Sequence, residues 1–408
     1  MNQKLTVTEE LLAKLSAIGS DPTGGLTRLL FDTNWKKAQE TLRAHFENAG
    51  LTTSYDAAGN LIGSITGSEF PGQTVLTGSH IDTVRNGGSL DGQYGILAGF
   101  LAIDRLVKKH GTPKRTLAVV SFAEEEGSRF PFVFWGSKNL VGSVDRSAVK
   151  DLVDRDGIRF ADAMKQASFD PDASPDAPRT DIVAFVEAHI EQGAVLQHLD
   201  KQVGVVTAIA GQKRYNVRLI GEANHAGTTP MQMRRDAVEG AARIMTYLLD
   251  EARRLGDPLV LTFGKLEPKP NIGNVVPGEI LFSVDTRHTS QDALNSFARL
   301  IEGTISKTTD LLNLDVEIDN WMDEPPVPMN LDLIELFCTS CTELGVDYHV
   351  MHSGAGHDSQ IMAPKVPTAM LFVPSIKGIS HNPAEDTAME DLVTGIDVLE
   401  SALFKLAY

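Results

Sequence analysis

Five of the eleven histidines lie in polar turns close to glycine or a carboxylate residue. Histidine in such a setting is a frequent metal ligand or acid–base catalyst, because neutral imidazole presents a nitrogen lone pair near neutral pH. These five are His80, His189, His225, His357 and His381. The others lack that setting, and we expect surface or core positions for His45, His110, His198, His288, His349 and His352.

The segment from His80 to Asp91 combines imidazole and carboxylate groups at the end of an apolar run. Alternation along a strand puts His80 and Asp82 on the same side. The Asp82 carboxylate can therefore orient the His80 ring through its second nitrogen, as is usual around metal-bound imidazole. The glycine-rich stretch that follows lets the backbone bend, so that Asp91 reaches the same point.

Three consecutive carboxylates, Glu124, Glu125 and Glu126, follow the next apolar run. Adjacent carboxylates repel one another unless a cation neutralises them. Alone, this run is also compatible with a solvated acidic loop, but together with the preceding histidine–aspartate segment it favours a metal centre. Histidine and carboxylate ligands without cysteine suit Zn²⁺ or Mn²⁺. Metal-assisted hydrolysis would need one of these glutamates to remain free as a general base.

These side chains need a scaffold that brings separate strand ends together. Apolar runs ending in polar residues predict the strands TVLTGSHIDTV, TLAVVSFAEEEGS and VAFVEAHIEQG, and helical periodicity covers residues 8–18, 34–49 and 94–107. Strands that alternate with helices predict an α/β fold with a mainly parallel central sheet. Ligands then gather beyond the carboxyl ends of the strands.

The pattern changes after about residue 210, where elements follow in the order β-α-β-β-α-β. That order resembles a ferredoxin-like α+β sandwich inserted into the chain. The prolines Pro325, Pro326 and Pro328 mark a return linker. We therefore expect one domain made of residues 1–210 and 328–408, and an inserted domain made of residues 211–327.

The charge balance bears on the partners. Lysine and arginine number 37 against 54 aspartates and glutamates, which gives a net charge of −17. Nucleic acid and anionic membranes are therefore not expected as partners, and an anionic substrate would need a local cationic clamp. No run approaches the roughly 18–20 apolar residues of a membrane helix. The N-terminus lacks a signal-peptide core, so we expect a cytoplasmic location.

Four other chemistries find no support in the sequence. Two cysteines cannot make a disulfide framework. Cys338 and Cys341 have CxxC spacing but lie inside a helical pattern, which predicts helix packing rather than redox or metal chemistry. No serine has the glycine spacing of a hydrolase nucleophile elbow, and no glycine-rich nucleotide-binding motif occurs.

Several segments together resemble the amidase/hydantoinase-carbamoylase branch of the dinuclear metallo-aminoacylase and carboxypeptidase superfamily. They follow that family's order from about residue 77 to residue 386: TGSHIDTVRNGGSLDGQYG, AEEEGSRF, EAHIEQG, ANHAGTTPM, NVVPGE, DTRH, SGAGHDSQ and ISHNPAED. Within that branch, AEEEGSRFPFVFWGSKNLVG, GDPLVLTFGKLEPKPN, WMDEPPVPMN and MHSGAGHD are most similar to the allantoate amidohydrolases.

The resemblance implies a metallopeptidase-like catalytic domain that holds two divalent metal ions per subunit, Mn²⁺ or Zn²⁺. Glu125 would be the general base, and Asp82 would orient a ligand. His189 stands where the peptidase branch has an acidic residue, in agreement with the amidase branch. The implied ligands are His80 and His189 for one metal, Glu126 and His381 for the other, and Asp91 for both.

The resemblance also assigns roles in substrate binding and assembly. His225 would stabilise the oxyanion of the tetrahedral intermediate, while Asn274 and Arg287 would bind the substrate carboxylate and amide. An arginine suits the carboxylate, because its planar fork makes two parallel charge-assisted bonds. The inserted domain would act as a lid and form a homodimer in which His225 reaches the neighbouring subunit's metals. The remaining pocket residues would be Gln192, Gly356 and His357.

The implied reaction is hydrolysis of a ureido C–N bond in purine nitrogen salvage. With allantoate, a small anion with two ureido groups, the products would be ureidoglycine, carbon dioxide and ammonia. An N-carbamoyl-L-amino-acid hydrolase or a β-ureidopropionase would use the same site. A metallopeptidase agrees less well with His189. A non-catalytic binding protein on this fold is the alternative of a different class, and the complete ligand set argues against it.

Overall fold

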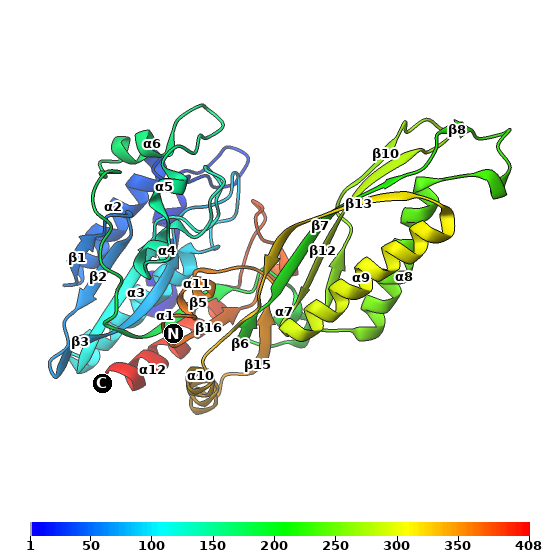
Figure 1. The fold of residues 1–408 in the computed structure, drawn as a ribbon. Helices are drawn as coiled ribbons and strands as arrows, with labels where there is room; N and C mark the ends of the chain where they lie inside the picture. Colours follow the sequence, from blue (N-terminus) through cyan, green and yellow to red (C-terminus); the bar gives the residue numbers. More distant parts are fainter. Residues whose placement is uncertain (1) are drawn as a thin grey trace. The chain divides into compact units, whose positions relative to one another are not determined.

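The computed structural model describes residues 2–408, which form two compact units (Figure 1). The larger unit contains the chain up to Thr207 together with Met329–Tyr408, and the smaller unit contains Ala208–Pro328. Among residues 2–408, no helix is long and apolar enough to cross a membrane. Each unit has its own apolar core and is described separately below.

A nine-stranded sheet forms the centre of the larger unit. The neighbouring strands are, in order, β1 (Thr52–Tyr55), β2 (Leu61–Ile65), β4 (Arg115–Phe122), β3 (Phe70–His80), β5 (Ile182–Ile190), β16 (Thr368–Val373), β6 (Val203–Ile209) and β14 (Val327–Pro328), and β15 (Tyr348–Ser353) also pairs with β6. The four strands β4, β3, β5 and β16 are parallel. The pairs on either side of them are antiparallel. The predicted parallel arrangement therefore holds at the centre, with antiparallel strands at both margins.

Helices bury both faces of this sheet. Leu117 and Val119 of β4 pack into one apolar cluster, while Ala118 and Val120 pack into the other. Strands buried on both sides are apolar throughout, which explains the continuous apolar runs in the sequence. The first cluster includes residues of α1 (Asn2–Ser16), α2 (Thr33–Asn48), α3 (Gln93–His110), α6 (Phe160–Gln166), α10 (Leu331–Leu344) and α12 (Met389–Ala407), and the second includes residues of α4 (Trp135–Leu140) and α11 (Asp358–Met362).

Short helical segments lie in the loops of the larger unit: α5 (Arg146–Val149), α7 (Val195–Leu199) and the 3₁₀ turn η2 (Ile376–Gly378). Both cysteines lie on α10, where Cys341 is buried in the first cluster. Burial raises the pKa of the Cys341 thiol to about 12, so this group stays neutral. This environment is that of an apolar packing residue and not of a reactive thiol.

The smaller unit is an antiparallel sheet with two long helices on one face (Figure 1). Its strand order, β10-β12-β7-β13 with β9 also on β12, is that of a ferredoxin-like sandwich. The elements are β7 (Gly211–Ile220), α8 (Ala237–Leu255), β9 (Val260–Thr262), β10 (Leu266–Lys269), β12 (Glu279–His288), α9 (Gln291–Leu312) and β13 (Asp315–Glu324). A separate ribbon pairs β8 (Asn224–His225) with β11 (Val275–Val276), and η1 covers Met231–Met233. The predicted α/β fold with an inserted α+β sandwich is confirmed.

A buried arginine fixes the segments that lead to the site. Arg28 is fully buried, and its Nη2 donates to the Gln93 side chain and to the Leu15 carbonyl, both at 2.6 Å, while Nε donates to the Ile18 carbonyl at 2.9 Å. Burial lowers the pKa of Arg28 to about 9, which still leaves it protonated at neutral pH. Because Gln93 begins α3 two residues after Asp91, Arg28 anchors the start of that helix.

Candidate metal centre

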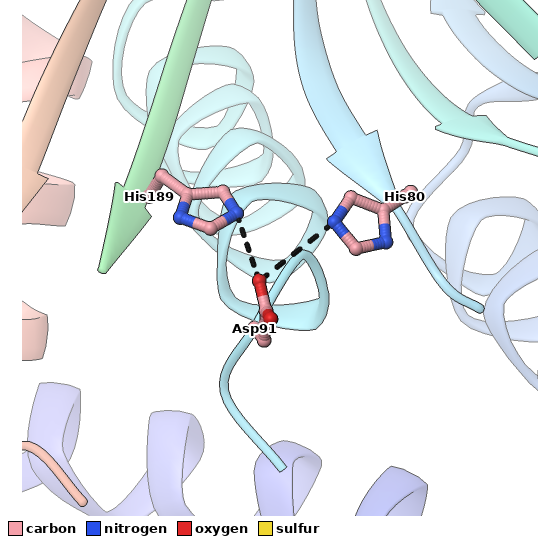
Figure 2. A group of neighbouring side chains, drawn as sticks. All are labelled: His80, Asp91 and His189. Carbon is pink, nitrogen blue, oxygen red and sulfur yellow. Dashed lines mark ion pairs between the residues drawn. The ribbon is translucent and has the colours of Figure 1, made fainter. Parts of the chain in front are cut away.

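Two neighbouring parallel strands bring imidazoles to one edge of the sheet. β3 ends at His80, and His189 is the penultimate residue of β5. Asp91 reaches the same edge from the turn before α3 (Figure 2). The turn needs glycine after Asp91, because Gly92 has φ +66° and a Cβ there would lie 2.4 Å from the His80 ring. Strand-end spacing predicted that His80 and Asp91 meet, and the family resemblance added His189 to them.

Asp91 is shared between two groups of possible ligands. Its Oδ1 lies 3.2 Å from Nε2 of His189 and 3.8 Å from Nε2 of His80 (Figure 2). Its Oδ2 lies 3.0 Å from Nε2 of His381, which is 3.5 Å from Oε1 of Glu126. Within each group the candidate ligand atoms all lie within 4.8 Å of one another. The structure therefore brings together all five residues expected to hold metal.

The ring orientations fit a metal in the first group. Nδ1 of His80 is 3.0 Å from the backbone carbonyl of Asp82, and Nδ1 of His189 is 2.9 Å from that of Ile190. An Nδ1–H that donates to a carbonyl leaves Nε2 as the atom that can bind an ion, and in both rings Nε2 faces Asp91. With Nε2 deprotonated, the two imidazoles and one carboxylate form a donor set that suits Zn²⁺ or Mn²⁺.

The second group fits a cation for an electrostatic reason. Oε1 of Glu126 is buried and has no hydrogen-bond partner. Burial, followed by the nearby charge of Asp91, raises the pKa of Glu126 to about 7. Burial likewise raises the pKa of Glu125 well above its usual range. Buried carboxylates that lie close to one another ionise at neutral pH only if positive charge is nearby. A divalent ion would supply that charge to Glu125 and Glu126.

Asp82 is the residue that ties the His80 strand end to the acidic loop. Its carboxylate accepts the backbone N–H of Glu125 at 3.2 and 3.1 Å and that of Glu126 at 3.1 Å. It also lies 3.4 Å from Nδ1 of His80, farther than the backbone carbonyl of Asp82 itself. Asp82 thus orients two strand ends at once, which is more than the expected contact with His80 alone.

Glu385 is a buried residue that sequence reasoning did not single out. Its Oε1 accepts the backbone N–H of Leu90 at 2.9 Å and of Asp91 at 3.1 Å, and its Oε2 accepts the Ser380 hydroxyl at 2.9 Å. It therefore connects the turn that bears Asp91 to the loop that bears His381. The sequence feature that could have indicated Glu385 is its position in ISHNPAED, four residues after the candidate ligand His381.

Three further expected residues border this centre in different ways. Gln192 donates from Nε2 to Oδ2 of Asp91 at 3.1 Å. The buried His357 ring packs edge-to-face on His189 with ring centroids 4.5 Å apart, and burial lowers its pKa well below the usual range. A Cβ on Gly356 would lie 3.1 Å from the Phe134 ring. Gln192 and His357 therefore lie beside candidate ligands, whereas the contact of Gly356 is with Phe134.

A third group, Glu187, His189 and His357, also has ligand atoms within 4.8 Å of one another. Both oxygens of Glu187 are already hydrogen bonded, Oε1 to the Ser79 hydroxyl at 2.7 Å and Oε2 to the Ser359 hydroxyl at 2.6 Å. We therefore interpret Glu187 as a residue that supports the strand end beneath His189.

The three expected residues of the smaller unit do not lie together. His225 and Asn274 are neighbours on the β8–β11 ribbon, where the N–H of Ala226 donates to the Asn274 carbonyl at 3.0 Å. Arg287 lies near the opposite end of β12, eight residues from Glu279. At about 3.3 Å per residue that separation is roughly 26 Å. One copy of this unit therefore cannot direct His225 and Arg287 at the same small molecule.

Comparison with known proteins gives agreeing matches over nearly the whole chain. The profile of peptidase family M20/M25/M40 matches residues 76–405. An allantoate amidohydrolase of Escherichia coli (strain K12) is 52% identical, with 98% of this chain and 97% of the relative covered. An N-carbamoyl-L-amino acid amidohydrolase of Geobacillus stearothermophilus is 37% identical, with 97% of each covered. The crystal structure of a hydantoinase/carbamoylase family amidase from Burkholderia multivorans has a TM-score of 0.94 at 30% identity, over 99% of this chain and 98% of that one.

The contacts of Glu385 lead to a prediction about metal affinity. Glu385→Gln should weaken the binding of Mn²⁺ or Zn²⁺ by about 10- to 100-fold, because the loops that carry Asp91 and His381 lose a shared charged acceptor. Titration calorimetry on metal-free protein measures this, and circular dichroism checks the fold. Glu390→Gln, an exposed change five residues further on, is the matched control and should bind normally. Equal affinity in both variants would contradict the proposed role of Glu385.

Proposed function

This chain belongs to peptidase family M20/M25/M40, and from that membership we propose that it is a metal-dependent amidohydrolase that cleaves a ureido C–N bond of allantoate. Ureidoglycine, carbon dioxide and ammonia would be the products. The observation that carries the reaction class is the Asp91 carboxylate shared by two groups of histidine and carboxylate ligands. The substrate proposal rests on the relative that is 52% identical over 98% of this chain.

The family is dinuclear and metal-dependent, and the larger unit has ligand groups that fit two ions. We propose His80, His189 and Asp91 for one ion and Asp91, Glu126 and His381 for the other, with Mn²⁺ or Zn²⁺ bound. Such ions, when bound, supply Lewis-acid activation of water and of a carbonyl oxygen. The larger unit would then be the catalytic domain of a cytoplasmic enzyme.

Glu125 would move the proton in this reaction. It adjoins the proposed ligand Glu126 and is held by the contact between its own N–H and Asp82. As the ionised general base, it would take a proton from the attacking water. As the resulting acid, it would give that proton to the nitrogen of the leaving group.

The hydrogen bonds of the His225 ring leave Nε2 as the atom that can donate to an oxyanion. Its Nδ1 accepts the backbone N–H of Gly227 at 3.0 Å and of Thr228 at 3.2 Å. A neutral ring that accepts at Nδ1 carries its proton on Nε2, so Nε2 is a donor. We propose that this Nε2–H donates to the oxyanion of the tetrahedral intermediate.

The remaining contacts would select the substrate. Arg287 would hold the carboxylate of allantoate, and the Asn274 side chain would bind an amide group. Gln192, Gly356 and His357 would line the rest of the pocket around the metal centre. A cationic clamp is needed because the chain as a whole carries −17 and would otherwise disfavour an anion.

We propose that assembly brings His225 to the metals: His225 of one subunit acts at the metal centre of a partner subunit. The smaller unit would thus serve as the lid and dimerisation domain of a two-fold homodimer. In such a dimer the exchange is reciprocal.

A second candidate function is hydrolysis of N-carbamoyl-L-amino acids. It is favoured by the relative of that name, which is 37% identical over 97% of this chain. The two substrates share a ureido group and a carboxylate, so the same residues would act on both.

Kinetic comparison of the two substrate classes tests the proposed function. With Mn²⁺ present, kcat/KM for ammonia release from allantoate should exceed that from a panel of N-carbamoyl-L-amino acids. A chelator should abolish turnover, and added Mn²⁺ or Zn²⁺ should restore it. A higher kcat/KM for the carbamoyl amino acids would favour the second candidate, whereas full turnover by metal-free protein would overturn both.

The variant Glu125→Gln tests whether Glu125 is the general base and not a metal ligand. We expect turnover to fall by roughly 10²- to 10⁴-fold, because the amide cannot accept the proton. Metal content, measured by atomic absorption, should stay the same, whereas in Glu126→Gln it should fall. If Glu125→Gln is the variant that loses metal, the two glutamates have exchanged roles.

A mixed dimer of two inactive variants tests the shared active site. If His225 acts on the partner's site, a heterodimer of His225→Ala and Glu125→Gln has one site with both changes and one with neither. Activity should therefore reappear when the two proteins are mixed and their subunits exchange. Differently tagged chains confirm that the heterodimer forms. A confirmed heterodimer as inactive as its parents would show that His225 does not act in trans.

A further inference from the structure

Two charged networks cross the sheet face of the smaller unit that α8 and α9 leave uncovered. In the first, Glu279 lies between Arg218 at 2.7 Å and Lys269 at 2.8 Å, and Arg218 also reaches Glu317 at 3.1 Å. Two cations and two carboxylates make this network neutral. It spans β10, β12, β7 and β13 and has the character of a sheet-stabilising ladder.

The second network contains Arg287 and has a different composition. Oδ1 of Asp285 accepts a hydrogen bond from Nε of Arg287, and Oδ2 accepts one from Nη2 of Arg287, both at 3.0 Å. Oδ2 also accepts a hydrogen bond from Nε of Arg214 at 2.8 Å. Two guanidinium groups therefore contact the same carboxylate.

The sheet fixes the geometry of the trio. Asp285 and Arg214 are directly opposite in the antiparallel pairing of β12 with β7. Arg287 follows two residues after Asp285, so strand alternation puts both on the same face. The Arg214 guanidinium lies over the Trp321 ring at 5.5 Å, at the point where the register of β13 shifts. Arg214 is therefore held from two sides, and it in turn holds Asp285.

Partial burial makes these contacts stronger than those of an ordinary surface pair. The side chains of Arg287 and Asp285 are 27% and 26% exposed, and that of Arg214 is 31% exposed. Burial alone would raise the pKa of Asp285, but its hydrogen bonds and charge interactions with Arg287 and Arg214 bring it below the usual value. Asp285 is thus ionised at neutral pH and opposes the repulsion between the two arginines.

We infer that Asp285 and Arg214 are positioning residues that hold the Arg287 guanidinium in one plane for the carboxylate of the substrate. This inference rests on the proposed role of Arg287 as the carboxylate clamp. A guanidinium held through Nε and one Nη loses little further side-chain freedom when a ligand binds. The pair therefore acts on substrate affinity and on selection for carboxylate, and not on the bond-breaking step.

The test compares allantoate with its carboxamide analogue, which lacks the charge but retains both ureido groups. In Asp285→Asn, KM for allantoate should rise about 10-fold or more, because a charge-assisted contact to Arg287 is lost. The kcat for allantoate and the KM for the carboxamide should change little. Glu279→Gln is the matched control, because it removes a carboxylate held between two cations on the same strand but does not alter the Arg287 trio.

The outcomes separate this inference from the proposed function. Arg287→Ala should abolish the preference for carboxylate over carboxamide, and if it does not, the clamp role itself is wrong. If Arg287→Ala behaves as expected but Asp285→Asn alters both substrates equally, or no more than Glu279→Gln, the positioning role is overturned. If Asp285→Asn does not fold, the variant Arg214→Gln tests the positioning role in its place. It removes the second support of the Asp285 carboxylate and should raise KM for allantoate alone, and an unchanged preference would overturn the inference.

Discussion

The candidate centre depends on keeping one carboxylate, that of Asp91, ionised in a nearly water-free place. Burial alone would raise its pKa, but hydrogen bonds and charge interactions with imidazoles, chiefly those of His189 and His381, bring it well below the usual range. The start of α3 directly after Asp91 also favours a negative charge there. Burying an isolated charge of this kind raises the free energy of the folded state, so the groups that offset it must be held at fixed positions.

That requirement explains why so many contacts around Asp91 come from backbone and from residues without direct chemistry. Arg28 fixes the start of α3 through Gln93, Glu385 receives the N–H of Asp91, and Asp82 holds the acidic loop. Each joins segments that are far apart in the chain. The parallel strands β3 and β5 supply the common edge at which these segments meet. A loose loop at any of these places would separate the ligands by more than a metal site tolerates.

The smaller unit carries its charged groups on the sheet face that its helices leave open. On β12, arginines there are paired with carboxylates at two places. Around Glu279, the contacts join β10, β12, β7 and β13 and stabilise the sheet. Around Asp285, the same chemistry holds the Arg287 guanidinium against its own strand and Arg214 of the next.

The sequence alone determined the fold class and the chemical types at the centre, because periodicity and residue type are local properties. It placed His80, His189 and the glutamate run at strand ends and Asp91 in a glycine-rich turn, and resemblance to a known family gave His381 its role as a ligand. Tertiary structure decided which of these atoms meet. The contact of the Asp82 carboxylate with the N–H of Glu126 depends on long-range folding, as do the two N–H groups bound by Glu385. The meeting of Arg214 with Asp285 depends on strand register. No spacing in the chain specifies such register, since pairing partners are chosen by the packing of the whole sheet.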